Sequence, residues 1–176
     1  RRHEQVLAPY EVRRRGSEEA KAAIGKRAAE LVEDGDIIFI DSGTTTLHMI
    51  DFLADKRDLT IITNSLLVAD RMGNQGARVF STGGQLQERS KSFGGSMAEH
   101  AIRSFHADKM FFSAAGVSEN GDISDFYEDD IAVRQAAAQE APVLANNIYD
   151  RGRAVRSPFY TSELAIHIQT YLFQIG

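Results

Sequence analysis

One stretch of the chain has residue types that can hold an anion. Asp41-Ser42-Gly43-Thr44-Thr45-Thr46 directly follows the apolar run Ile37-Ile38-Phe39-Ile40, and the next residues carry Leu47, Ile50 and Leu53 at a spacing of three. This pattern predicts a buried strand, a small polar loop and a helix N-terminus. The free N–H groups and positive dipole end of such a helix favour phosphate or carboxylate, and nearby hydroxyls add donors.

We therefore predict a phosphate site in the Asp41–Thr46 loop, with backbone N–H groups and the hydroxyls of Ser42, Thr44 and Thr45 as donors. Asp41 is expected to orient the loop or a sugar hydroxyl, because a carboxylate repels phosphate. The alternative is an ordinary strand-to-helix turn in which Ser42 and Thr44 cap the helix. The stretch lacks the lysine of a P-loop and the spacing of a dinucleotide fingerprint.

Repeated strand and helix patterns predict how this loop is positioned. Leu59–Thr63 and Ala77–Ser81 read as strands, and each is followed by a polar or glycine-rich segment and then a helix. Such alternation predicts an α/β fold with a central, mostly parallel sheet flanked by helices. Ligands of these sheets bind at the carboxyl ends of the strands. We expect Thr63-Asn64-Ser65 to contact the ligand or shape its pocket, and Gly83-Gly84 to let backbone approach it.

Two further segments of the chain are rich in charged residues. The connection from Thr82 to Gly95 is long and contains Arg89 and Lys91, which favours a binding flap over a simple link. The acids between Glu119 and Asp130 are expected to be solvated charges at the start of a helix.

Composition limits the remaining classes of function. The chain has 176 residues, 43% hydrophobic content and a net charge of −5, as in an ordinary single globular domain that does not hold nucleic acid by itself. It has no cysteine, no metal-type spacing of its five histidines, and no apolar run long enough to cross a membrane. We expect a cytoplasmic domain without metal or cofactor.

The N-terminal residues lack a sustained apolar period. We predict a linker over residues 1–16 and a domain over residues 17–176 that begins with an amphipathic helix from Ser17 to Asp34. The expected buried stripe of that helix is Ala20, Ile24, Ala28 and Leu31.

Ordered motifs then reveal a resemblance that covers residues 7 to about 145. They are Leu7-Ala8-Pro9-Tyr10-Glu11-Val12-Arg13, Asp41–Thr46, Thr63-Asn64-Ser65, Thr82-Gly83-Gly84-Gln85-Leu86, Ala107-Asp108-Lys109, Ala115-Gly116-Val117, and Glu128 followed by Val133-Arg134. In order and spacing they resemble the effector domain of DeoR-type bacterial transcriptional repressors.

The resemblance implies a fold similar to ribose-5-phosphate isomerase and the coenzyme A transferases. It also implies a phosphorylated sugar as effector, operator DNA bound only through a helix-turn-helix module before residue 1, and a homo-oligomer. Lys109 and Arg134 become candidate charge partners of the ligand, or members of internal salt bridges, one of them with Glu128.

The sequence departs from the family pattern near its C-terminus. The family strand that ends in an Ala-Asp-Ser-Ser-Lys-like stretch reads Val143-Leu144-Ala145-Asn146-Asn147 here, without the lysine. Arg151 and Arg153 are candidate replacements. Residues 153–176 match no family pattern, and Leu164, Ile168 and Leu172 form a helical stripe there.

Three functions remain open at this level. Binding without turnover is favoured, because Ala114-Ala115-Gly116-Val117 replaces the acid-rich strand end of the isomerases. The alternatives are a small sugar-phosphate isomerase or CoA-transferase-like enzyme, and an oligomerisation domain that has lost its ligand.

Overall fold

Five parallel strands form the centre of the computed structural model, which describes residues 9–114, 116–117, 123–141 and 143–146. The strands are β1 (Ile37–Ile40), β2 (Thr60–Thr63), β3 (Arg78–Ser81), β6 (Lys109–Phe112) and β9 (Val143–Asn146). Their order across the sheet is β3-β2-β1-β6-β9, and all four neighbouring pairs are parallel. The predicted α/β class with a parallel central sheet is confirmed.

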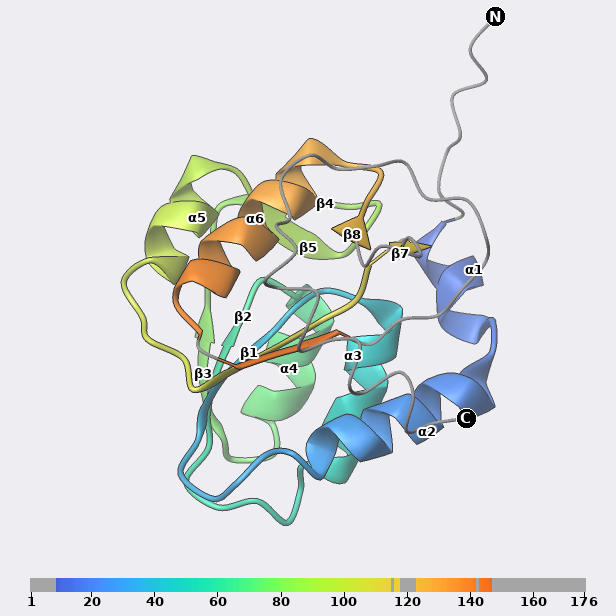
Figure 1. The fold of residues 1–176 in the computed structure, drawn as a ribbon, viewed down its shortest axis with the longest axis vertical. Coiled ribbons are helices and arrows are strands. Elements are labelled where there is room, and N and C mark those ends of the chain that lie inside the picture. Colours follow the sequence, from blue (N-terminus) through green and yellow to red (C-terminus); the bar gives the residue numbers. More distant parts are fainter. Residues whose placement is uncertain (1–8, 115, 118–122, 142, 147–176) are drawn as a thin grey trace, which may run out of the picture.

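Helices cover both faces of this sheet (Figure 1). One face carries α2 (Glu18–Ala29), α3 (Thr44–Met49), the 3₁₀ turn η1 (Ile50–Phe52) and α4 (Leu66–Gly73), and the other carries α5 (Ser96–Ile102) and α6 (Glu128–Gln139). Two small hairpins complete the described part of the chain: β4 (Gln85–Gln87) with β5 (Ser92–Gly94), and β7 (Gly116–Val117) with β8 (Ile123–Ser124). None of the helices in this part is long and apolar enough to span a lipid bilayer.

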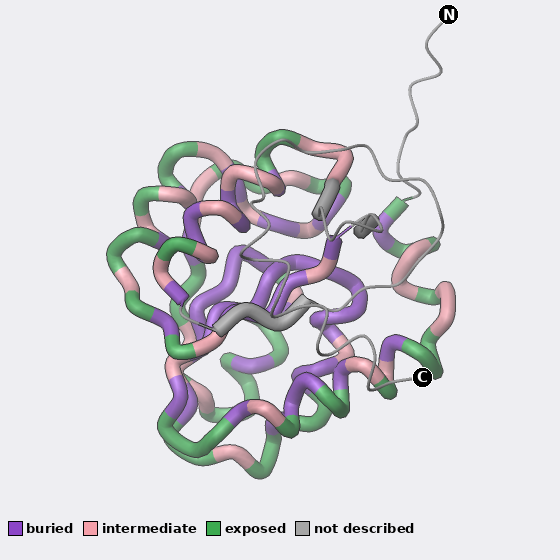
Figure 2. Tube along the Cα trace, in the orientation of Figure 1, coloured by how far each residue is buried: buried purple, intermediate pink, exposed green. Residues whose placement is uncertain are grey.

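Strand β1 divides the core into two layers. Ile38 and Ile40 pack with the α2, α3 and α4 side, whereas Phe39 packs with the α5 and α6 side. Alternate residues of a strand point to opposite faces, so a strand of four apolar residues serves both layers. Figure 2 shows the buried sheet enclosed by helices whose outer residues are exposed.

The buried face of α2 differs from the predicted stripe. Ala20 is exposed and Ile24 is only partly buried, whereas Lys21, Gly25 and Ala28 are buried. The reason is a close helix contact: a Cβ on Gly25 would lie 2.7 Å from the backbone nitrogen of Met49 in α3. Because Gly25 has no side chain, the backbones of α2 and α3 can come into contact. The side of α2 that carries Gly25 therefore faces the core in place of the predicted apolar stripe.

The segment predicted as a linker includes a packed helix. Tyr10–Arg15 form α1, and the Tyr10 side chain is buried at 3% exposure. Its six residues are too few for a periodic apolar signal, which is why the sequence did not reveal it. The Arg151 and Arg153 candidates and the 153–176 stripe lie outside the described residues.

We expect Gly25→Ala to lower the free energy of unfolding by about 1–3 kcal/mol, because the added methyl group meets the α3 backbone at less than van der Waals distance. Urea denaturation measures this change. Gly73→Ala in α4 is the matched control, since nothing lies within 4 Å of its Cβ position. Alanine has the higher helix propensity, so Gly73→Ala should leave the free energy of unfolding unchanged or raise it slightly. A Gly25→Ala variant as stable as Gly73→Ala would contradict the α2–α3 contact.

Candidate functional site

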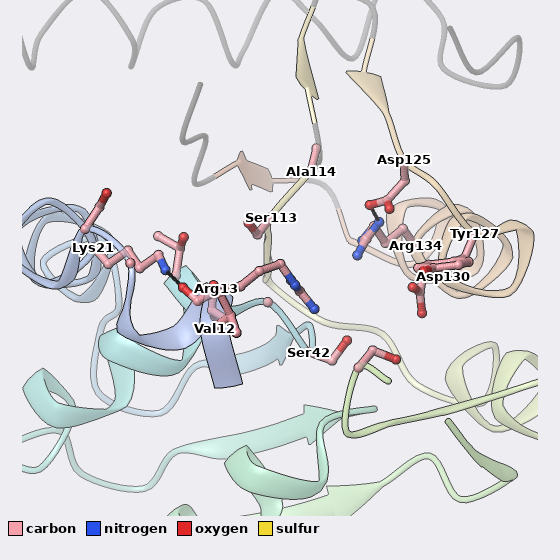
Figure 3. Close-up of a pocket in the computed structure, with 16 residues that line it drawn as sticks. Val12, Arg13, Lys21, Ser42, Ser113, Ala114, Asp125, Tyr127, Asp130 and Arg134 are labelled. Atoms are coloured by element: carbon pink, nitrogen blue, oxygen red, sulfur yellow. Dashed lines mark hydrogen bonds and ion pairs between the residues drawn. The ribbon is translucent and has the colours of Figure 1, made fainter. Parts of the chain in front are cut away.

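A pocket of about 270 Å³ opens at the carboxyl ends of β1 and β6. The strand order reverses at this point, since β2 lies on one side of β1 and β6 on the other, and such switch points are where open α/β sheets bind ligands. The lining residues are Val12, Arg13, Gly16, Ser17, Lys21, Ser42, Gly43, Thr44, Thr45, Ser90, Ser113, Ala114, Asp125, Tyr127, Asp130 and Arg134. Figure 3 shows the labelled members of this set.

The loop after β1 supplies the floor of the pocket. Ser42, Gly43, Thr44 and Thr45 all line it, and Thr44 and Thr45 form the first turn of α3. Gly43, not Ser42, is the N-cap residue, and no side chain caps this helix. The first-turn N–H groups of α3 therefore face a pocket that also offers several hydroxyls.

Two residues of the same loop have internal roles. The Thr46 hydroxyl donates to the carbonyl oxygens of Asp41 and Gly43, at 2.8 and 2.7 Å, and Thr46 is fully buried. A Cβ on Gly43 would lie only 2.5 Å from the Cβ of Ser113. Thr46 thus holds the loop closed, and Gly43 lets it pass close to the end of β6.

A buried arginine connects this loop to the opposite wall. Arg134 of α6 places Nε 2.6 Å from Oδ2 of Asp41, and its Nη1 forms a second ion pair with Asp125. The side chains of Arg134 and Asp41 are 7% and 1% exposed. Arg134 therefore lines the predicted site, but its partners are two aspartates, not Glu128, which is exposed at the start of α6. Asp41 was predicted to orient the loop or a sugar hydroxyl; its Oδ2 pairs with Arg134, and its Oδ1 accepts from the Ser42 hydroxyl at 3.4 Å.

Basic side chains reach the pocket from α1 and α2. Lys21 is buried and its Nζ donates to the backbone carbonyl of Arg13. Arg13 packs over the Tyr10 ring at 5.4 Å, and burial lowers its pKa, an effect that attraction to Tyr10, Asp125 and Asp130 opposes. Sequence reasoning missed both residues, because residue 13 fell in the expected linker and residue 21 outside the expected buried stripe.

Asp130 faces the basic residues from α6. Burial raises its pKa to about 6, with the Arg134 charge opposing the rise and Asp41 and Asp125 adding to it. Within the described chain no hydrogen bond or ion pair holds the Asp130 carboxyl. The acids around residue 125 were expected to be solvated, but Asp125 and Asp130 are pocket residues because α6 packs its first turn against the sheet end.

The loop after β2 supports the loop that forms the pocket floor, but it does not line the pocket. The Thr63 hydroxyl donates to the Ile40 carbonyl at 2.6 Å and accepts from the Ser65 amide at 3.0 Å. Ser65 caps α4 by accepting from Val68 N at 3.2 Å, and the Asn64 backbone pairs with Phe93. Thr63, Asn64 and Ser65 lie beside the site but do not line the pocket.

The long connection after β3 is a hairpin that covers the pocket edge. Its Ser90 lines the pocket, and the Arg89 guanidinium lies 3.8 Å from the centre of the Tyr127 ring. Gly83 and Gly84 are outside the pocket, where Gly84 allows close packing against the carbonyl oxygen of Gly94. The hairpin therefore contributes the Ser90 hydroxyl to the pocket. Its Arg89 packs against Tyr127, whose ring forms part of the pocket wall.

Lys109 lies at the other end of the sheet. Its Nζ is 2.7 Å from Oδ2 of Asp36, the residue before β1. Lys109 begins β6, so it sits at the amino end of the strand while the pocket is at the carboxyl end. The structure thus does not bring this predicted site residue together with the others.

We predict that Asp130→Asn raises the free energy of unfolding more at pH 7.5 than at pH 4. Ionisation of Asp130 costs folding free energy because its folded pKa is raised from 3.8 to about 6. The cost is absent near pH 4 and complete above about pH 7, and it amounts to about 3 kcal/mol at most. Urea denaturation at both pH values tests this, with exposed Asp129→Asn as control. Equal effects at both pH values would contradict it.

Loss of Arg134 should be severe. Arg134→Met leaves Asp41 and Asp125 buried without their counter-charge, so we expect a loss of about 3 kcal/mol or more in the free energy of unfolding. Arg103→Met, which removes an exposed pair with Glu99 at 3.8 Å, should cost less than about 1 kcal/mol. Comparable losses in the two variants would contradict a structural role for the buried pairs.

Known structures share the fold of this chain. Ribose 5-phosphate isomerase A from Methanocaldococcus jannaschii is similar over 74% of this chain and 52% of its own, with a TM-score of 0.56 and 15% identity. At this identity the likeness concerns the fold alone, and it confirms the expected similarity to ribose-5-phosphate isomerase.

Sequence relatives are regulators of transcription. The transcriptional repressor AccR of Agrobacterium fabrum is 40% identical over 98 residues, which are 55% of this chain and 38% of AccR. The HTH-type transcriptional repressor GlcR of Bacillus subtilis is 31% identical over 157 residues, 89% of this chain and 60% of GlcR. The chain thus spans about half the length of such relatives. The family model of the DeoR C terminal sensor domain matches residues 17–145. This chain therefore belongs to the family of DeoR C-terminal sensor domains.

Proposed function

We propose that the sensed ligand is a phosphorylated sugar and that its phosphate binds at the Ser42–Thr45 loop. The observation that carries this proposal is the meeting of two cationic side chains, the buried Lys21 and the partly buried Arg13, with the N-terminus of α3 in one pocket. Two positive charges match a phosphate dianion, and the helix N–H groups and hydroxyls satisfy its oxygens. The remaining hydroxyls and carboxyls of the pocket suit sugar hydroxyls.

We also propose that helix α1 transmits occupancy of the pocket. Arg13 reaches the pocket from α1, and its backbone carbonyl accepts from Lys21. A phosphate between these two side chains would tie α1 to α2. A ligand shifts an equilibrium only if it prefers one arrangement, and contacts made from α1 supply such a preference.

The longer relatives support the proposal that this sensor is part of a larger protein. GlcR is named an HTH-type repressor, and we propose that the regulator to which this domain belongs binds operator DNA through such a module, in the cytoplasm and as a homo-oligomer. Palindromic operators are bound by symmetric dimers or larger assemblies, which supports the last point.

Binding without turnover fits the site best. Two of the carboxylates near the pocket, Asp41 and Asp125, are committed to Arg134. Asp130 is the carboxyl left for proton transfer, and isomerisation needs a further acid on the other side of the sugar. A coupled assay for aldose–ketose interconversion tests this: sustained turnover that Asp130→Asn abolishes would favour the enzyme alternative.

Lys21→Met should abolish binding of phosphorylated sugars. A panel of sugar phosphates and their unphosphorylated parents is screened by thermal shift, and a ligand at 100 times its Kd should stabilise the protein by about 2.7 kcal/mol. We expect only phosphorylated compounds to act, and Lys21→Met to remove the shift because the phosphate loses a buried counter-charge.

Lys26→Met is the matched control, since Lys26 lies on the exposed face of the same helix. Loss of binding in both variants would indicate damage to α2. Stabilisation of the wild type by unphosphorylated parents to the same degree would contradict a phosphate site.

A further inference from the structure

The pocket wall opposite the basic residues is acidic. Asp125 and Asp130 line it beside Tyr127 and Arg134, whereas Lys21 and Arg13 come from the other side (Figure 3). In this view the Arg13 side chain extends from the Lys21 side toward the middle of the pocket. A ligand that fills the pocket with its phosphate at Lys21 must therefore direct its other end to this acidic wall.

Arg134 does not make the wall attractive to a second anion. Its guanidinium already pairs with Asp41 at 2.6 Å and with Asp125, so its single positive charge faces two buried carboxylates. Asp130 adds a third acid with no described hydrogen bond or ion pair. Ionised Asp41 and Asp125 outweigh the single charge of Arg134, and ionised Asp130 adds a further negative charge, whereas Arg13 attracts Asp125 and Asp130 from the other side of the pocket.

The Asp130 carboxyl makes no hydrogen bond or ion pair with the described part of the protein. Asp130 is 8% exposed and lines the pocket. Its oxygens are not among the enclosed polar atoms that lack a partner, so a ligand group in the pocket can reach and bond to them. Hydroxyl and ammonium groups donate to a carboxylate, whereas a carboxylate or second phosphate would place like charges together.

We propose that the effector carries one phosphate and, at its remote end, hydroxyl or amino groups but no acid, and that Asp130 is the residue that sets this specificity. The inference rests on the proposed function, because it takes the phosphate to lie at the basic side. It excludes phosphorylated sugar acids and sugar bisphosphates as effectors.

Matched compounds that differ at one remote group test the proposal. Isothermal titration calorimetry at pH 7.5 compares glucose 6-phosphate, glucosamine 6-phosphate and 6-phosphogluconate, and likewise arabinose 5-phosphate with 5-phosphoarabinonate. In the wild type we expect each acid to bind at least about tenfold more weakly than its parent sugar phosphate. In Asp130→Asn this ratio should fall to about threefold or less.

Asp129→Asn is the control, because Asp129 is the exposed neighbour on the same helix and should leave the ratio unchanged. Since the ratio is measured within each variant, a general loss of stability cancels. Acids that bind the wild type as well as their parents, or an unchanged ratio in Asp130→Asn, would overturn the assignment of Asp130 and leave the phosphate site intact. Failure of every phosphorylated compound to bind would instead refute the proposed function, and this inference with it.

Discussion

A buried arginine between two aspartates holds the candidate site together. Arg134 lies on α6, Asp41 at the end of β1 and Asp125 just after β8, so one side chain joins α6 and the segment before it to a loop 93 residues away in sequence. Buried charges are stable only when paired, and each group here depends on the others. Breaking this pairing would leave buried charges unpaired at a high cost in free energy, and the pocket between β1 and α6 therefore keeps its shape.

Two glycines permit the close contacts that surround this pairing. Gly25 brings α2 against α3, and Gly43 brings the β1 loop against Ser113 at the end of β6. The first contact presents Lys21 to the pocket, and the second puts the start of α3 beside β6. Both positions have ordinary backbone angles, so the absence of a side chain, rather than conformational freedom, is what the fold uses there.

The site is electrostatically asymmetric. Cations arrive from α1 and α2 and acids from the segment that begins α6, with hydroxyls of the central loops between them. The two groups attract one another across the unliganded pocket, and the acids help to keep Arg13 charged against the effect of its burial. A ligand with a negative end and a hydrogen-bond-donating end matches this arrangement better than a uniformly charged one.

The sequence by itself determined the central strands, the sheet class and the Asp41–Thr46 loop, because continuous apolar runs and strand-to-helix turns are local patterns. It also placed Arg134 in the site through family resemblance. Only tertiary structure decided that Lys109 faces Asp36 at the far end of the sheet, that Thr63–Ser65 support the site from behind, and that Arg13, Lys21 and Asp130 line the pocket. These positions depend on which strand end a residue occupies and on how helices rotate to make close contacts. Pairings over distances such as that from residue 41 to residue 134 leave no periodic signal in the chain.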